Sequence, residues 1–98
     1  MTLSFLDAAQ SEFEKATDYY EQQRAGLGFE FAEEVEQALK RIKHYPEAWS
    51  PLSPRVRRCL VNQCPYSVIY EVRSEIIIIV AIQHHHQEPE SWRTRIIE

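Results

Sequence analysis

The sequence predicts a single α+β domain, in which an N-terminal strand and an antiparallel two-helix hairpin pack on an antiparallel sheet. Two stretches carry apolar residues at helical spacing, and three later runs have the composition of strands. A proline-rich segment separates the two groups. The predicted order is therefore strand, helix, helix, strand, strand, strand, and residues 1–98 form one domain with a C-terminal tail from about residue 87.

The first helix follows a short strand, expected at Leu3 to Phe5 or Leu6. Asp7 is expected to cap the helix, and Gln10 completes an approximate capping box. The helix runs to about Arg24. Apolar residues mark its inner face: Ala9, Phe13, Ala16 and Tyr20. Charged residues mark an opposite face that is expected to be solvated: Glu12, Lys15, Asp18 and Glu21.

Two glycines, Gly26 and Gly28, break the helical pattern and are the only glycines in the chain. The second helix follows and ends at Pro46, because proline cannot continue the hydrogen-bond ladder. Its inner face repeats the helical spacing: Phe31, Val35, Leu39 and Ile42. The short connection predicts that the two helices are antiparallel neighbours.

The second half of the chain is expected to be a loop followed by three strands. Residues 46–54 hold three prolines and two serines, which is typical of a loop. Strands are expected at residues 57–63, 66–73 and 76–83. The connections between them are short, so the three strands should form an antiparallel meander.

The last strand raises a question, because the run IIIIVAI at residues 76–82 is apolar on both faces. A central position in the sheet explains most of this apolar character. The helices cover only one face, however, so the other face needs a cover as well. Residues 88–98 are one candidate, with Trp92 and Ile96 as apolar contacts, and a partner chain is the other.

Three histidines follow that strand. In an extended chain His84 and His86 point one way and His85 the other. A solvated strand end is one interpretation, and acid–base chemistry or phosphate contact is the alternative. No third ligand completes a metal site, so neither a metal nor another cofactor is expected. Cys59 and Cys64 are interpreted as reduced thiols.

Charge is distributed unevenly along the chain, whose net charge is −4. Residues 1–45 carry nine acidic and five basic side chains, whereas residues 46–98 carry six of each. The acidity argues against tight nonspecific binding of nucleic acid. The basic residues that stand out form a cluster and a tail pair: Arg55, Arg57 and Arg58, with Arg93 and Arg95. They are either a solvated edge or a surface that recognises phosphate or carboxylate groups.

The sequence contains no membrane or secretion signal. Its longest apolar run is far shorter than the ~20 residues that span a bilayer. No basic segment precedes an apolar one at the N-terminus. We therefore expect a cytoplasmic protein without membrane contact.

Three stretches together resemble the RelE/ParE toxin superfamily of bacterial type II toxin–antitoxin modules. They are YYEQQRAGLGFEFAEEVEQALKRIKHYP (19–46), RRCLVNQCPYSVIYEV (57–72) and IIIIVAIQHHHQEPESWRTR (76–95). The resemblance covers nearly the whole chain and implies the strand and helix order predicted above. It also implies a small toxin that an antitoxin neutralises by covering its groove and sheet. The toxin is expected to form a homodimer, or a heterotetramer together with the antitoxin.

The resemblance leaves the target open between two branches. RelE-like members cleave mRNA on the ribosome, whereas ParE-like plasmid stabilisation toxins poison DNA gyrase. RelE-like nucleases carry basic residues on the sheet and a tyrosine near the C-terminus. At the matching positions this chain retains only Arg58, with Leu60, Ser67, the histidine run and Trp92 at the others.

These departures and the overall acidity favour a ParE-like gyrase inhibitor. Residues expected to contact a partner or target are Arg55, Arg57, Ile77, Ile79, Trp92, Arg93 and Arg95. The first alternative is an mRNA interferase, an endoribonuclease with Arg58, His85 and His86 as its catalytic residues. The second is a non-toxic member that retains only antitoxin binding.

Overall fold

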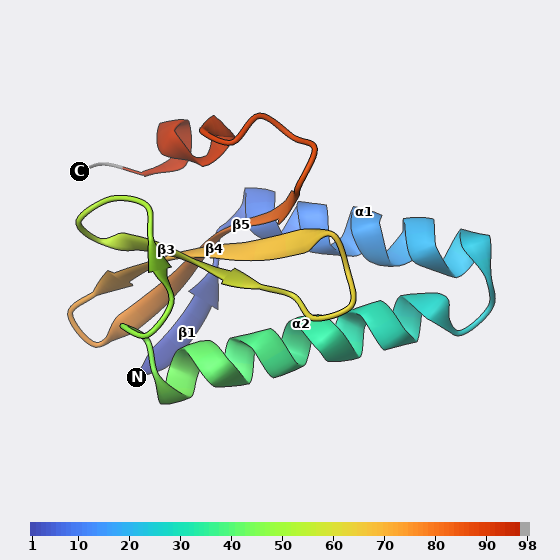
Figure 1. Ribbon diagram of the computed structural model, residues 1–98, viewed down its shortest axis with the longest axis horizontal. Coiled ribbons are helices and arrows are strands. Elements are labelled where there is room, and N and C mark those ends of the chain that lie inside the picture. The colour runs from blue at the N-terminus through green and yellow to red at the C-terminus, as the bar shows by residue number, and fades with distance from the viewer. Residues whose placement is uncertain (97–98) are drawn as a thin grey trace.

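The structure, a computed structural model, describes residues 1–96 and has the predicted order of helices and strands (Figure 1). The elements are β1 (Thr2–Phe5), α1 (Asp7–Gln23), α2 (Leu27–His44), β2 (Ser50–Pro51), β3 (Val56–Leu60), β4 (Tyr66–Arg73), β5 (Ile76–His84) and the 3-10 helix η1 (Ser91–Arg95). The two-residue strand β2 lies within the segment that was predicted to be a loop. The predicted fold class is confirmed.

One strand pairing differs from the prediction. The strands are ordered β1-β5-β4-β3-β2, and β3, β4 and β5 form the expected antiparallel meander. Strand β1 pairs in parallel with β5, from Thr2 opposite Ile76 to Phe5 opposite Ile79, so the sheet is mixed. Local sequence patterns could not predict the direction of this pairing, because it joins segments from opposite ends of the chain.

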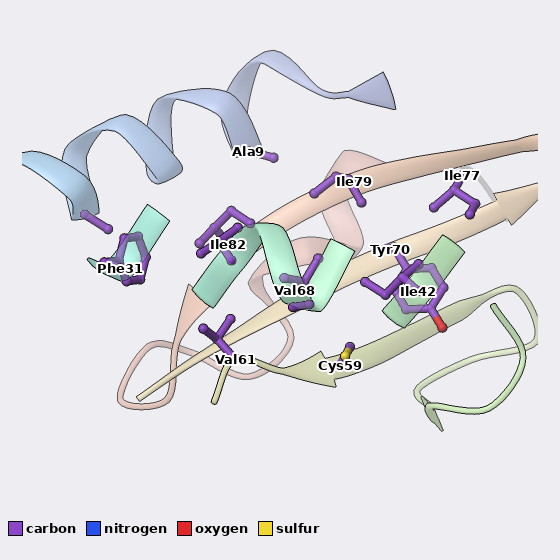
Figure 2. Packing of buried hydrophobic residues seen from close by; sticks show 13 residues of the cluster. Ala9, Phe31, Ile42, Cys59, Val61, Val68, Tyr70, Ile77, Ile79 and Ile82 are labelled. Atoms are coloured by element: carbon purple, nitrogen blue, oxygen red, sulfur yellow. The ribbon is translucent and has the colours of Figure 1, made fainter. Parts of the chain in front are cut away.

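The helices cover one face of the sheet and form the larger core with it. Figure 2 shows Ile77, Ile79 and Ile82 of β5 in this core, together with Phe31 and Ile42 of α2. The inner faces predicted for both helices are confirmed. Their remaining members are buried or packed against the core: Ala9, Phe13, Ala16, Tyr20, Val35 and Leu39.

A β-bulge explains how β5 serves both faces. Ile69 lies opposite Ala81 and Tyr70 opposite Ile79, which leaves Val80 as the extra residue in β5. Val80 and Ala81 both join the smaller core on the far face, and Ile82 returns to the helical face. Simple alternation would have placed Ile79 and Ile82 on opposite faces.

The C-terminal segment covers the second face of the sheet. After β5 the chain turns back along the sheet (Figure 1), and Trp92 packs there with no exposed surface. Its neighbours in this smaller core are Val56, Ile69, Val80 and Ala81, with Leu52, Ile78 and Ile96 at the margin. Of the two candidate covers for β5, the tail therefore fills the role, and no partner chain is needed for it.

The start of α1 differs from the prediction. Leu6, not Asp7, is the N-cap residue, and no side chain caps the helix. The carbonyl of Leu6 accepts the amide hydrogen of Gln10, while the Gln10 side chain donates to Glu14. Asp7 thus lies in the first turn, where its negative charge interacts favourably with the positive end of the helix dipole.

The turn between the helices is held by Glu21, which was expected to be solvated. Its carboxylate accepts hydrogen bonds from the backbone amides of Gly26 and Gly28 at 3.0–3.1 Å. These amides lie at the start of α2, where the helix has no internal partners for them. Gly26 has a φ of +90°, which suits glycine.

Replacing Gly28 by alanine is expected to destabilise the fold by about 1–3 kcal/mol. An added Cβ would lie 2.7 Å from the carbonyl oxygen of Thr17, which is backbone of α1 and cannot move aside. Urea unfolding followed by circular dichroism measures the change. Gly26→Ala is the control, because its Cβ meets no atom within 4 Å and adds only backbone strain of roughly 1–2 kcal/mol. A neutral Gly28→Ala would contradict the close packing of the two helices.

Candidate functional sites

An apolar groove opens between β1 and the two helices. Its volume is about 470 Å³. Apolar side chains form most of its wall: Leu3, Phe5, Phe13, Ala32, Val35 and Leu39. Polar groups lie on its margin, and two of them are cationic: Gln10, Glu36, Lys40 and Lys43. Such a groove suits an amphipathic partner segment.

The groove runs beside an unpaired strand edge. Strand β1 bonds to β5 on one side, and within residues 1–96 no strand pairs with its other side. Backbone amide and carbonyl groups on such an edge can accept an additional strand from another chain. The edge and the groove together therefore form a surface for an extended peptide, with backbone pairing and apolar side-chain contacts side by side.

A second, polar hollow lies at the far end of β5, on the face covered by the tail. It measures about 110 Å³. The lining residues are Arg58, Ser67, Gln83, His84, His85, Gln87 and Pro89. The Nε2 atom of His85 lies 3.0 Å from the Ser67 hydroxyl. Two of the three candidate nuclease residues, Arg58 and His85, thus line one hollow, while His86 is exposed in the turn that follows.

The three arginines of the basic cluster lie on different surfaces. Arg57 faces the helical side of the sheet, and its guanidinium donates to the carbonyl oxygen of Trp49 at 2.8 Å. Arg58 lies on the opposite face, beside Ser67 and His85. Arg55 is exposed before β3 begins and does not line the hollow. Alternation along β3 separates Arg57 from Arg58, and Arg55 lies outside the strand.

The two tail arginines, Arg93 and Arg95, form contacts with other residues of this chain. Arg95 forms two hydrogen bonds of 2.8 Å to the carboxylate of Glu12 and a third of 3.0 Å to the carbonyl of Val80. Glu12 also accepts the backbone amide of Ile82. The bonds to Glu12 raise the pKa of Arg95 above its usual value, against a smaller opposing effect of burial. Arg93 lies over the ring of Trp92 and pairs with Glu90.

Three residues expected to contact a partner are inside the molecule. Ile77, Ile79 and Trp92 have no exposed surface. Their burial does not fit direct contact with another chain, because helices cover the two isoleucines and the tail carries the tryptophan into the sheet. Ile77 and Ile79 pack in the larger core and Trp92 packs in the smaller one.

Sequence patterns missed both the groove and the role of Glu12. Phe13 and Leu39 were correctly placed on inner helical faces, but only the position of β1 shows that part of that face stays open. Glu12 looked solvated because its ion-pair partner, Arg95, lies at the other end of the chain. No local signal connects two such distant residues.

Two further features are absent from residues 1–96. No group of three histidine, cysteine or acidic side chains there lies close enough to hold a metal ion. None of the helices in this part of the chain combines the length and apolar character needed to cross a membrane.

Comparison with known protein families gives one match that spans most of the chain. Residues 3–89 match the family described as the ParE toxin of the type II toxin–antitoxin system, parDE. The chain belongs to the ParE toxin family. Family membership supports a cognate antitoxin as its partner.

A solved structure agrees with this assignment at the level of the fold. It is described as a chromosomal ParDE TA system from P. aeruginosa and matches with a TM-score of 0.75 and 17% identity. The match covers 86% of this chain and 95% of the other. A comparison with curated proteins found no match. The ParE match ends at residue 89, so Trp92 and Arg95 lie outside it.

Proposed function

We propose that this ParE family member is a toxin that inhibits DNA gyrase in the cytoplasm and is neutralised when its antitoxin binds the β1 groove. The observation that supports neutralisation is the apolar groove beside the edge of β1 that no strand of residues 1–96 pairs with, and membership of the ParE toxin family supports the toxic activity. A surface of this kind binds another polypeptide, and the family provides one in the antitoxin.

The groove also indicates what the antitoxin segment should look like. An extended segment would add a strand to β1 through its backbone and place alternate apolar side chains against Phe13 and Leu39. Acidic residues in the segment would meet Lys40 and Lys43 at the margin. Such complementarity favours the cognate partner over other apolar peptides.

The arrangement of the polar residues supports a binding toxin over a nuclease. RNA cleavage needs a base for the 2′-hydroxyl, a group that stabilises the phosphate charge and an acid for the leaving oxygen. Arg58 and His85 share a hollow, but His86 lies outside it. The ring of His85 is also hydrogen-bonded to Ser67. Of the two histidines expected to act as acid and base, His85 and His86, the hollow therefore holds only one.

In a supercoiling assay, the purified toxin is expected to inhibit DNA gyrase, and the added antitoxin should restore its activity. In bacteria, thymidine incorporation should stop before methionine incorporation after induction. Earlier arrest of methionine incorporation would support the mRNA interferase instead. If both continue, the chain poisons neither target, and the gyrase proposal is wrong.

A further inference from the structure

We propose that the toxin binds its target through the α2 pocket, which lies between the last turns of α2 and Trp49. The pocket would receive an acidic protein segment that carries an apolar side chain. The proposal rests on the proposed function, because a toxin needs a surface for its target in addition to the groove for its antitoxin. Three observations support it: an ordered aromatic wall, available positive charge and separation from the groove.

The α2 pocket has a volume of about 380 Å³, and most of its surface is apolar. Its lining residues are Gln37, Lys40, Arg41, His44, Tyr45 and Trp49. Tyr45 is 66% exposed, so its ring is open to a partner. Tyr, Trp and Arg are the residue types that contribute most often to the binding energy of protein interfaces. The composition of the pocket therefore suits contact with another protein.

The segment that forms the far wall of the pocket is fixed by hydrogen bonds. The Trp49 ring donates from Nε1 to the carbonyl oxygen of Arg41 at 3.4 Å, and Arg57 donates to the carbonyl oxygen of Trp49 at 2.8 Å. The Tyr70 hydroxyl donates to the carbonyl oxygen of Pro46. A wall that is ordered before binding lowers the entropic cost of receiving a partner.

The pocket carries positive charge, and no carboxylate lines it. The ammonium group of Lys40 has no hydrogen-bond or ion-pair partner within residues 1–96. The Nδ1 atom of His44 lies 2.9 Å from the carbonyl oxygen of Lys40. A carbonyl only accepts, so Nδ1 carries the hydrogen and Nε2 is left to face a partner. The charge of the pocket favours acidic groups.

The distribution of charge along α2 favours a short acidic segment over a long polyanion. The first half of the helix carries acidic side chains: Glu30, Glu33, Glu34 and Glu36. The last turns carry basic ones: Lys40, Arg41, Lys43 and His44. A nucleic acid that followed α2 would meet the carboxylates, and the net charge of −4 disfavours it further. A short acidic peptide can meet the basic turns alone and place an apolar side chain against Tyr45 and Trp49.

The α2 pocket and the antitoxin groove are different surfaces that share one residue. Of the residues that line the pocket, only Lys40 also lines the groove. An antitoxin with an acidic residue at Lys40 would therefore compete with the target for the same cation. This competition lets an antitoxin in the groove neutralise the toxin without filling the pocket.

Tyr45→Ala tests the pocket by growth arrest in bacteria, whichever enzyme the toxin acts on. The toxin concentration that arrests growth should rise at least about tenfold, as for the loss of an aromatic residue at the centre of an interface. Phe29→Ala is the matched control, because Phe29 is a 68% exposed ring on the same helix and lines neither the pocket nor the groove. Its effect should be less than about twofold. Unchanged arrest by Tyr45→Ala overturns the proposal.

Antitoxin affinity and gyrase inhibition separate this proposal from the proposed function. By isothermal titration calorimetry, Tyr45→Ala should bind the antitoxin within about twofold of the unmodified chain. A tenfold loss there would assign the pocket to the antitoxin and overturn its role in target binding. If the unmodified chain arrests growth without inhibiting gyrase, the gyrase proposal fails and the growth assay still tests the pocket. If the unmodified chain arrests nothing, both proposals fail.

Labelled probes test the chemistry of the partner by fluorescence polarisation, with the groove blocked by Ala32→Glu. A peptide of alternating glutamate and phenylalanine should bind, and adding Tyr45→Ala should weaken its binding about tenfold. A peptide of alternating lysine and phenylalanine should bind at least about tenfold more weakly than the acidic one. Equal binding of the two peptides overturns the preference for acidic groups. Binding of a short DNA duplex that Tyr45→Ala removes would assign the pocket to nucleic acid and overturn the proposal.

Discussion

Replacing Trp92 by alanine is expected to lower the free energy of unfolding by about 3–5 kcal/mol. The indole is fully buried and is the largest member of the core between the tail and the sheet. Its removal would leave a cavity beside Val80 and Ala81 and expose the second face of β5. This loss is a large fraction of the 5–15 kcal/mol that stabilises a typical domain, so thermal or urea unfolding will show it clearly.

Trp92→Phe is the matched control for this prediction. The indole nitrogen of Trp92 has no hydrogen-bond partner within residues 1–96, so phenylalanine gives up volume but no hydrogen bond. We expect it to be less than half as destabilising as alanine. A loss below about 1 kcal/mol for Trp92→Ala would contradict the packed position of the tail.

Replacing Ala32 by glutamate is expected to weaken binding of the antitoxin at least about a hundredfold. Ala32 lies on α2 in the wall of the apolar groove, half-buried beside Val35. A carboxylate at this position would either be desolvated by the antitoxin or exclude its apolar side chains, and both effects cost several kcal/mol. Isothermal titration calorimetry with the cognate antitoxin measures the loss. In cells, the antitoxin should no longer relieve growth arrest.

The control for the groove is Ala25→Glu, which adds the same charge at an exposed residue between the helices. It should leave antitoxin affinity unchanged within about twofold, because a surface charge outside the interface contributes little. Circular dichroism should show that both variants are folded. If Ala32→Glu binds the antitoxin as tightly as the unmodified chain, the antitoxin does not occupy the groove and this part of the proposed function fails.

Local patterns in the sequence were sufficient for the helices, the meander and the family. The spacing of Phe31, Val35 and Ile42 identified the buried face of α2, because a helix repeats every 3.6 residues whatever it packs against. Alternation in β4 and the short turn at Ser74 identified the antiparallel strands in the same way. Alternation along β3 also explains why Arg58 lies on the face opposite Arg57.

How these elements pack depends on contacts between segments that are far apart in the sequence. The parallel pairing of β1 and the ion pair of Glu12 with Arg95 join residues from opposite ends of the chain, and Trp92 packs against residues of β3, β4 and β5. The bulge at Val80 reverses the alternation of β5 and brings His85 to the face of Arg58. The helices and strands could be predicted because their periods are properties of the local backbone. The groove and the hollow arise from contacts between distant residues, and such contacts leave no periodic pattern in the sequence.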